Sequence, residues 1–595
     1  MNPSQAISRE FLQQSIDAEI KSLEESLRVL KYRRNALSPV SSLHPELFAA
    51  IFSILCLPGT SPQDGKPVDY HLARLRVSHV CHQWREITLN LPLLWSYVNF
   101  TSKSLSSVGI AETLVRAKSA PLRFEANFPG HLWDHDRSHT FQKALHTHAP
   151  HIRHLQISAD DVLLHNILEG LRVVSPVLTL KHLSLSSITT EKRGRIWASI
   201  PDTLFNSSTP KLSRLKLDNC NISWRSPLFK GLKYLEILNP SVNARPELTV
   251  WLAALDEMPQ LTTLTLRSAS PIAPPFPFVV SYTVTLPSLK SLNIFASPRD
   301  CALALAHLDL PALTSLCLTS FSSHSLSKSD VQKLLPFIAR HAYGPQDTQP
   351  LQSVLIRSEE HRVDILAWPV SDIGVEMHDL PTLLTETLPT RVALSFRSDG
   401  WSGPRNRLEI LEMVMASLPL DGLVMLDAHD LSYSELEQGL QTQHFWNHLS
   451  PMWPQLQCVR LAPAAAHGFI EMVLEDNGGG KKPLLPSLTQ LVMLKFSLRS
   501  LPLLPLRNAL MKRVKEGVPV KVLDLRMCGT ADNRAEDWLQ SLNDIVVDVL
   551  RPNLGERRQM ELTWEAYEPF DDDEHYDDDH SGSDEMGESF AESLT

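Results

Sequence analysis

The sequence predicts an α/β fold, a long solenoid of strand-and-helix units that follows an all-α module and an N-terminal helix. Three observations lead to this prediction. An L-x-x-L-x-L motif recurs from about residue 150 to 525, and its alternating outward positions are typical of a strand with one buried face. Prolines, 42 among 595 residues, interrupt the chain too often for long elements. Helical apolar spacing dominates the first hundred residues.

Residues 1–37 are predicted to form an amphipathic helix, most clearly from 8 to 37. Its apolar side chains are spaced by four and three residues, which is the rhythm of a coiled coil, and they are Ile16, Ile20, Leu23, Leu27 and Leu30. Only about two heptads are regular. The stripe therefore fits two structures, packing on the following module or homodimerisation through residues 8–37, and the sequence leaves both open.

Residues 38–100 are predicted to form a small helical module. Pro45 suits a first helical turn, and Leu47, Ala50, Ile51 and Ile54 make one apolar face. A Pro/Gly-rich break follows, then a second helix from Leu72 to Ile87 and a short turn from Leu91 to Trp95. Such a module is too small to bury all of its apolar side chains. We therefore expect the remainder to contact a partner.

The L-x-x-L-x-L motif organises residues 101–565. The strict copies are 180–185, 212–217, 261–266, 289–294 and 313–318. Looser copies occupy 152–157, 232–237, 351–356, 456–461, 488–493 and 520–525. Helices are predicted between them, for example at 250–258 and 329–341, and the stretch 357–407 is expected to hold insertions or a distorted pair of units.

A proline precedes the first leucine of several copies by two residues, and these prolines are Pro210, Pro259, Pro287, Pro311, Pro454 and Pro486. Proline ends an incoming helix and cannot pair within a strand, so it marks the entry to each unit.

This pattern resembles degenerate leucine-rich repeats, about eleven in number. The copy at 212–222 matches L-x-x-L-x-L-x-x-C-x-I. In that family the Cys position, here Cys220, turns the chain inward and buries a small side chain. The resemblance implies a curved, horseshoe-like solenoid whose strand face binds proteins.

Residues 37–95 resemble an F-box, the three-helix module that attaches a substrate receptor to the Skp-type adaptor of a cullin ubiquitin ligase. The whole layout resembles F-box-like proteins with degenerate leucine-rich repeats, of a kind common in mushroom-forming fungi. The resemblance implies an adaptor-binding surface made by Leu43, Pro45, Glu46, Leu47, Ile51, Phe52, Val77, Val80, Cys81, Trp84, Arg85, Pro92, Leu94 and Trp95. Trp84 and Trp95 also suit a core that joins the module to the repeats.

The resulting expectation is a substrate receptor without catalytic activity of its own. Its candidate substrate-facing residues occupy outward motif positions, and they are Lys181, His182, Ser213, Arg214, Lys216, Thr262 and Thr263. The competing hypothesis is a scaffold outside any ligase, in which the helical module only caps the solenoid. No nucleophile elbow and no RING cysteine pattern supports an enzyme. The glycine-rich segment 478–482 is not a phosphate loop, because Lys482 and Pro483 follow Lys481 where the motif needs Ser or Thr.

Charge is concentrated in the last 28 residues. Residues 568–595 hold twelve carboxylates and no Lys or Arg, and without them the formal charge of −11 becomes +1. We expect this tail (566–595) to be disordered. The nearly neutral remainder gives no reason to expect nucleic-acid binding.

Seven scattered cysteines without a C-x-x-C pair, a polar Met1–Glu10 segment and no long apolar run favour the cytosol or nucleus, with no membrane association. A histidine cluster begins at His131, His135 and His139, one helical turn apart, and continues to His154. No Cys or Glu completes a familiar metal spacing, so we expect solvated or hydrogen-bonded histidines and no metal or cofactor.

Overall fold

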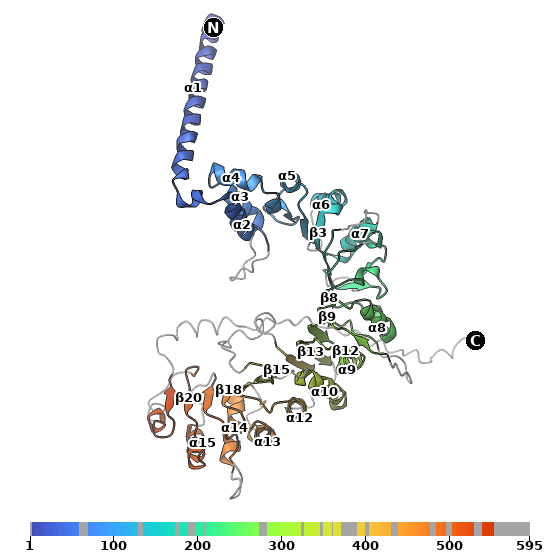
Figure 1. The fold of residues 1–595 in the computed structure, drawn as a ribbon, viewed down its shortest axis with the longest axis vertical. Helices are drawn as coiled ribbons and strands as arrows, with labels where there is room; N and C mark the ends of the chain where they lie inside the picture. Colours follow the sequence, from blue (N-terminus) through green and yellow to red (C-terminus); the bar gives the residue numbers. More distant parts are fainter. Residues whose placement is uncertain are drawn as a thin grey trace, which may run out of the picture.

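The computed structural model describes residues 3–58, 69–128, 135–172, 179–188, 197–207, 209–272, 282–322, 326–344, 349–359, 361–370, 390–398, 404–429, 438–475, 483–494, 503–528 and 538–551. Within these ranges the protein is a mixed α/β structure with one large sheet, preceded by a helical module and a long N-terminal helix (Figure 1). The acidic tail and the segment 478–482 lie outside the described residues, so their predicted disorder and flexibility stay predictions.

Seventeen strands make up the main sheet of the described chain. In spatial order they are β1 (Tyr97–Asn99), β2 (Leu122–Phe128), β3 (Ile152–Ala159), β4 (His182–Ser187), β6 (Arg214–Asp218), β8 (Tyr234–Leu238), β9 (Thr263–Arg267), β11 (Ser291–Phe295), β13 (Ser315–Ser322), β16 (Val392–Ser398), β15 (Arg362–Trp368), β14 (Ser353–Glu359), β17 (Met425–His429), β18 (Cys458–Leu461), β19 (Gln490–Met493), β20 (Val522–Asp524) and β21 (Asp548–Leu550).

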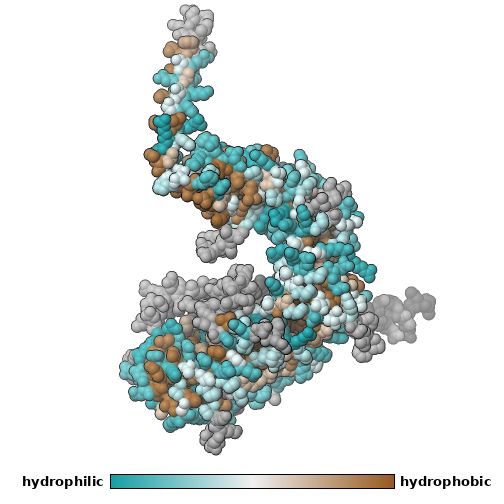
Figure 2. Space-filling model, viewed as in Figure 1, coloured by the Kyte–Doolittle hydropathy of each residue, from teal (hydrophilic) through white to brown (hydrophobic). Residues whose placement is uncertain are grey.

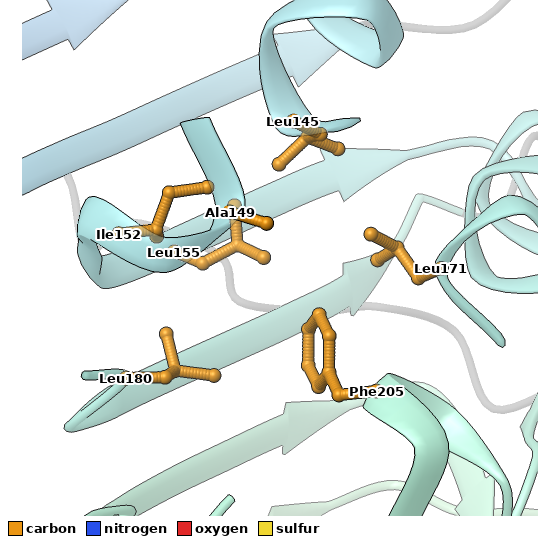
Figure 3. A pocket seen from close by; sticks show the side chains of 7 residues that line it. All are labelled: Leu145, Ala149, Ile152, Leu155, Leu171, Leu180 and Phe205. Carbon is orange, nitrogen blue, oxygen red and sulfur yellow. The ribbon is translucent and has the colours of Figure 1, made fainter. Parts of the chain in front are cut away.

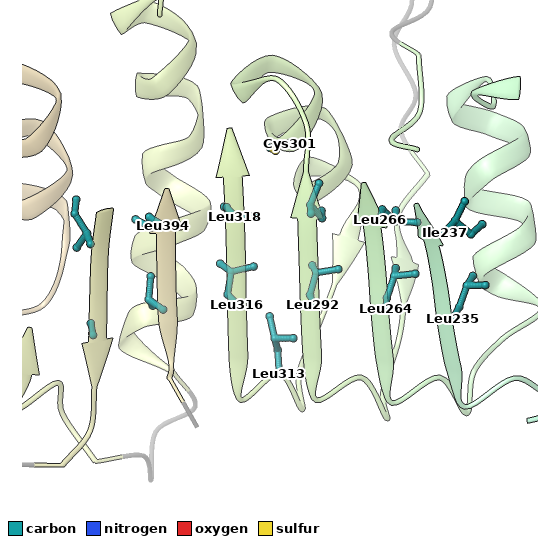
Figure 4. Close-up of a cluster of buried hydrophobic side chains, with 14 of the residues drawn as sticks. Leu235, Ile237, Leu264, Leu266, Leu292, Cys301, Leu313, Leu316, Leu318 and Leu394 are labelled. Carbon is teal, nitrogen blue, oxygen red and sulfur yellow. The ribbon is translucent and has the colours of Figure 1, made fainter. Parts of the chain in front are cut away.

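Every copy of the L-x-x-L-x-L motif overlaps one of these strands, and the leucines pair in register. Leu215 pairs with Leu235, Leu235 with Leu264, and Leu264 with Leu292. All four side chains are fully buried. Figure 4 shows Leu235, Leu264 and Leu292 of this ladder at the same level on neighbouring strands. Because a one-residue slip would expose every leucine, the shared spacing fixes the register of the sheet.

The prolines that precede the motifs occupy the second position of a turn. In each of the six cases the N–H of the motif's first leucine donates to the carbonyl oxygen three residues earlier, as from Leu261 to Met258 (3.0 Å) and from Leu289 to Leu286 (3.3 Å). Proline is favoured at this position because its fixed φ matches the turn. The predicted boundary is therefore confirmed, and its cause is a β-turn at the entry to the strand.

Helices cover the outer side of the curved sheet, while the strands line its inner side (Figure 1). They are α5 (Ser107–Ala117), α6 (His135–His148), α7 (Asp161–Arg172), α8 (Leu248–Asp256), α9 (Pro298–Ala306), α10 (Lys328–Tyr343), α12 (Pro404–Ser417), α13 (Gln438–Leu449), α14 (Pro463–Leu474) and α15 (Leu503–Lys515). The helices predicted at 250–258 and 329–341 are confirmed as α8 and α10. Shorter units use 3-10 turns, at η4 (Ala149–His151), η5 (Leu204–Ser207), η6 (Pro227–Phe229), η7 (Val242–Ala244) and η8 (Ser450–Met452). Two small parallel pairs, β5 (Ala198–Ile200) with β7 (Cys220–Ile222) and β10 (Val284–Thr285) with β12 (Leu308–Asp309), lie beside the main sheet.

Two polar residues turn the chain at the ends of neighbouring strands. Asn219 and Asn239 follow β6 and β8 with φ of 51° and 48°, a left-handed conformation that asparagine tolerates. Cys220 comes next and is fully buried, with its Sγ 3.8 Å from the carbonyl oxygen of Leu185. The inward turn expected at Cys220 is therefore observed.

The irregular stretch expected at 357–407 contains the one reversal of strand direction in the described part of the sheet. β15 runs antiparallel to both β14 and β16. As a result β13 pairs with β16, and β14 pairs with β17. The hairpin inserts two strands between neighbours that are otherwise consecutive, and the buried alternation continues through Val363, Ile365 and Ala367.

The N-terminal helix α1 (Pro3–Ala36) extends away from the body (Figure 1). Its apolar stripe is exposed throughout, from 48% at Ile20 to 64% at Leu23. Near its end the helix is tied to the body, where the Ser41 hydroxyl donates to the carbonyl oxygen of Asn35 (2.8 Å). The helix prediction is confirmed, whereas packing of the stripe on the following module is wrong for this conformation.

The module consists of η1 (Pro39–Ser42), α2 (Pro45–Cys56), α3 (Tyr70–Ser78), α4 (His82–Leu89) and η2 (Pro92–Trp95). Pro45 begins α2 as predicted. The single helix predicted from Leu72 to Ile87 is wrong, because the chain breaks at 79–81 and starts again at His82. Cys81 has extended backbone angles there, and a continuous apolar pattern across the break concealed it.

Candidate functional site

The module has its own aromatic core. The Trp84 ring packs against Phe48 and Phe52, with centroid distances of 5.6 and 5.1 Å. Phe48 and Phe52 are fully buried, as is the Cys56 thiol, whose pKa burial raises to about 11. This core holds α2 against α4 and fixes which side chains remain outside.

A set of apolar side chains remains exposed on this module. Four form a single stripe on α2 at helical spacing, and further ones come from α3, the break and η2. Together we name them the module patch, which consists of Leu47, Ile51, Ile54, Leu55, Leu72, Val80 and Leu93. Their exposed fractions run from 38% at Leu72 to 60% at Ile54. Figure 2 shows hydrophobic surface gathered over α2 and its neighbours. A grouping of this kind is typical of a protein-binding surface.

The predicted adaptor-binding residues fall into three groups. The exposed ones are Pro45, Glu46, Leu47, Ile51, Val80 and Arg85. The half-buried ones are Leu43, Cys81, Trp84 and Pro92. Phe52, Val77, Leu94 and Trp95 are core residues at most 8% exposed, so their assignment to a contact surface is corrected. Ile54, Leu55, Leu72 and Leu93 belong to the patch instead, and the helical spacing of Ile54 and Leu55 from Leu47 indicated two of them.

Trp95 joins the module to the sheet. Its indole N–H donates to the carbonyl oxygen of Thr88 (2.9 Å), and the guanidinium of Arg116 on α5 lies 4.7 Å from its ring centroid. Arg74 of α3 is 1% exposed and donates to the carbonyl oxygens of Leu94 (2.9 Å) and Tyr97 (3.2 Å). Burial lowers the pKa of Arg74 to about 10. The module is therefore fixed to β1 through a buried cation.

A second candidate site crosses the outward face of the first strands. Four basic residues pair in register on β2, β3, β4 and β6, and we name them the cationic row: Arg123, His154, His182 and Arg214. Aromatic rings close both ends. Arg123 lies 5.7 Å from the Tyr97 centroid and Arg214 lies 3.9 Å from that of Tyr234. The rings of His154 and His182 are 4.1 Å apart.

The field of the row is positive. Burial and then neighbouring cations lower the pKa of His154 to about 4. The pKa of His182 is lowered by burial and then by Arg214, Arg153 and Arg123. Both imidazoles are therefore neutral at pH 7, because protonation would add charge beside existing cations. The carboxylate nearest in register is Glu125, which accepts from the Tyr97 hydroxyl (2.8 Å).

The predicted substrate-facing residues also fall into groups, some in the cationic row and others bound to neighbouring groups. His182 and Arg214 belong to the row, and Thr263 continues it beyond Tyr234. Lys216 lies one register position on and forms an ion pair with Glu236 (2.8 Å). The hydroxyls of Ser213 and Thr262 instead donate to the backbone carbonyl oxygens of Lys181 and Lys233.

Lys181 adds a cation beside His182. Sequence reasoning missed Tyr97, Arg123 and Tyr234. It named His154 only as the last member of the histidine cluster and did not connect it with the strand face.

Other features offer less chemistry. A pocket between α6, α7, β3 and η5 is lined by Leu145, Ala149, Ile152, Leu155, Leu171, Leu180 and Phe205 (Figure 3). All seven are at most 2% exposed and apolar, so the pocket is part of the core. Among the residues placed by the structure, no group of three or more His, Cys, Asp or Glu could hold a metal ion, and His131 lies outside them.

No family model and no curated protein matches this chain. Among the described residues, no helix combines the length and the apolar character needed to cross a membrane.

Proposed function

We propose that this protein is a substrate receptor of a cullin-RING ubiquitin ligase, acting by binding and not by catalysis, in the cytosol or nucleus. In this proposal the module is an F-box-like domain that docks on a Skp-type adaptor. The sheet with its outer helices is a degenerate leucine-rich-repeat solenoid of horseshoe shape, and its inner strand face captures a protein substrate.

The module patch is the observation that carries the proposal. A helical module with a closed aromatic core around Trp84 still exposes seven apolar side chains, four of them on one stripe of α2. Exposed apolar surface costs roughly 25 cal/mol per Å² relative to burial. Binding in a partner's groove would recover this free energy. An apolar helix stripe entering a groove is a recurrent mode of protein recognition.

Rigid attachment of the module to the sheet would let the protein position a substrate within a ligase. Arg74 and Trp95 fix the module to β1, and the continuous sheet carries that placement to the outward faces of later strands. A substrate bound on the strand face is then held at a defined position relative to the adaptor. Such positioning raises the effective concentration of its lysines near the ligase's charged conjugate.

The test is co-purification with the cognate Skp-type adaptor. The parent chain is expected to bind, and Leu47→Asp and Val80→Asp are each expected to abolish binding, because a charge would enter an apolar interface. Both positions are more than half exposed, so folding should be unaffected. Val242→Asp is the matched control, since Val242 is equally apolar, 73% exposed and remote from the module. Absence of binding by the parent would contradict the proposal.

One observation favours a second candidate, a scaffold that binds a partner outside any ligase. Phe52, Val77, Leu94 and Trp95 are buried, and Arg74 ties them to β1. These residues close the apolar end of the sheet, which is what a cap does in a solenoid. In this case the parent chain would not bind the adaptor, and Leu47→Asp would have no effect on partner capture.

A further inference from the structure

We infer that the cationic row is a binding site for an acidic segment of a protein substrate. The inference deepens the proposed function, since the row lies on the strand face assigned there to the substrate. It also stands on its own geometry. Four basic side chains from four strands share one register line, and in their immediate surroundings Arg153 and Lys181 add charge.

The spacing of the row suits an extended peptide. Neighbouring strands are about 4.8 Å apart, so the three steps from Arg123 to Arg214 span about 14 Å. An extended chain places every second side chain about 6.8 Å along one face. Three alternate carboxylates therefore cover the row from end to end. Tyr97 and Tyr234, at its two ends, offer ring faces for apolar or aromatic neighbours of the acidic residues.

Existing carboxylates do not neutralise the row. Glu236 is committed to Lys216 and accepts a hydrogen bond from Tyr234. Glu125 accepts from Tyr97. The four charges of Arg123, Arg153, Lys181 and Arg214 therefore exceed those of the two nearby carboxylates, Glu125 and Glu236. A bound acidic segment would neutralise the positive charge of the row. Its affinity would fall with added salt, because salt screens the attraction.

The chain itself carries a segment of the required chemistry. Residues 568–580 read EPFDDDEHYDDDH and hold eight Asp and Glu together with two aromatic residues, Phe570 and Tyr576. This tail is the competing occupant, whereas we assign the row to an acidic segment of a substrate protein. The two sources share their chemistry and differ in whether the site is already occupied in the isolated chain.

Binding of a fluorescent peptide of residues 568–580, and of a twelve-residue oligoglutamate, tests the inference without any ligase component. The receptors are the full chain and a full chain in which the six aspartates of 571–573 and 577–579 are changed to asparagine. We expect at least one probe to bind the neutralised chain, and Arg123→Glu with Arg214→Glu to weaken that binding at least tenfold. Lys143→Glu with Arg299→Glu, on outer helices α6 and α9, is the charge-matched control and should change it less than twofold.

Each outcome is informative. Tighter binding to the neutralised chain than to the parent identifies the protein's own tail as the occupant. That result would overturn the assignment to a substrate, whereas equal binding to the two chains supports it. Failure of both probes to bind the neutralised chain overturns the inference, as does equal loss in the control variant. None of these results depends on adaptor binding, so failure of the ligase proposal is distinguishable.

A separate observation concerns α1. We propose that a second copy of this chain covers its exposed stripe, with the two helices antiparallel. The residues Ile16, Ile20, Leu23, Leu27 and Leu30 keep heptad spacing and are all at least 48% exposed. Among the residues that the structure describes, none buries this stripe.

Charge selects the orientation. With Ile20 and Leu27 at a positions and Leu23 and Leu30 at d, the flanking charges are acidic toward the start of the helix and basic toward its end. A parallel dimer places Glu19 beside Glu24 of the other copy. An antiparallel dimer places Leu23 opposite Leu27 of the other copy. It then pairs Glu19 with Arg33 and Asp17 with Lys31 across the interface. One unfavourable contact remains, between the Glu24 side chains of the two copies.

Light scattering of the full chain at 20 µM tests this proposal. We expect a dimer for the parent, a monomer for Leu23→Asp, and a dimer for the control Val108→Asp, whose side chain on α5 is 80% exposed. Lys31→Glu should weaken the dimer, and Lys31→Glu with Asp17→Lys should restore it. A monomeric parent overturns the proposal, and a dimer unaffected by Leu23→Asp overturns it equally.

Discussion

The guanidinium of Arg74 lies over the ring of Trp95, 5.4 Å from its centroid, at the junction between the module and the sheet. Arg74 also donates to two backbone carbonyl oxygens, which makes it a buried cation held by neutral acceptors and an aromatic face. Because removal would leave both carbonyls without their donor, the junction should depend on this residue.

We predict that Arg74→Met lowers the free energy of unfolding of the N-terminal region by about 3 kcal/mol, since hydrogen bonds from a charged donor contribute roughly 1.5 to 3 kcal/mol each. Urea unfolding followed by Trp fluorescence measures the change. Arg76→Met, on the exposed side of α3, is the control and should change stability by less than about 0.5 kcal/mol. Equal effects of the two variants would contradict the assigned role of Arg74.

The leucine ladder makes a prediction about the sheet. Leu264 is fully buried between Leu235 and Leu292, and Leu264→Ala should cost about 3 kcal/mol through the cavity it creates. Thr265→Ala, the next residue along β9, has an outward side chain and should cost less than about 1 kcal/mol. Thermal unfolding compares the two, and similar losses would indicate that the register is wrong.

Two histidines predict acid sensitivity. Burial lowers the pKa of His341 to about 4 and that of His154 also to about 4. The Nε2 atom of His341 lies 3.0 Å from the carbonyl oxygen of Arg391. Unfolded histidine takes up its proton below about pH 6.5, whereas these two remain neutral until about pH 4 when folded. Stability is therefore complete above pH 6.5, falls from 6.5 to 4, and levels off below.

Urea unfolding at a series of pH values measures this slope, and His341→Gln, which cannot titrate, should reduce it. His139→Gln is the control, because His139 lies on the exposed side of α6. A slope that His341→Gln leaves unchanged would contradict the burial argument.

Much of the fold followed from the sequence because one constraint repeats. Leu215, Leu235, Leu264 and Leu292 could be placed since each motif must bury the same two positions, and Pro259 marked its turn for a local steric reason. β14 to β16 could not be ordered, because strand direction in a hairpin depends on tertiary pairing. The break at Cys81 was hidden within one apolar pattern.

The candidate sites were predicted less well, and for a physical reason. Helical spacing shows which apolar residues share one face of a helix. Whether that face points inward, as for Trp95, or outward, as for Leu47, depends on the neighbouring elements. The cationic row required a register that aligns Arg123 with His154 across a β-bulge, which no single motif reveals.

Hydrogen exchange of the full chain, with and without the cognate Skp-type adaptor, is the sharpest test of docking through the module patch. We expect the adaptor to slow exchange in α2, α3 and η2, where the module patch lies, and to leave exchange in the strands from β9 to β21 unchanged. Slowed exchange on those strands without any change in α2, or no change anywhere at saturating adaptor, would contradict it.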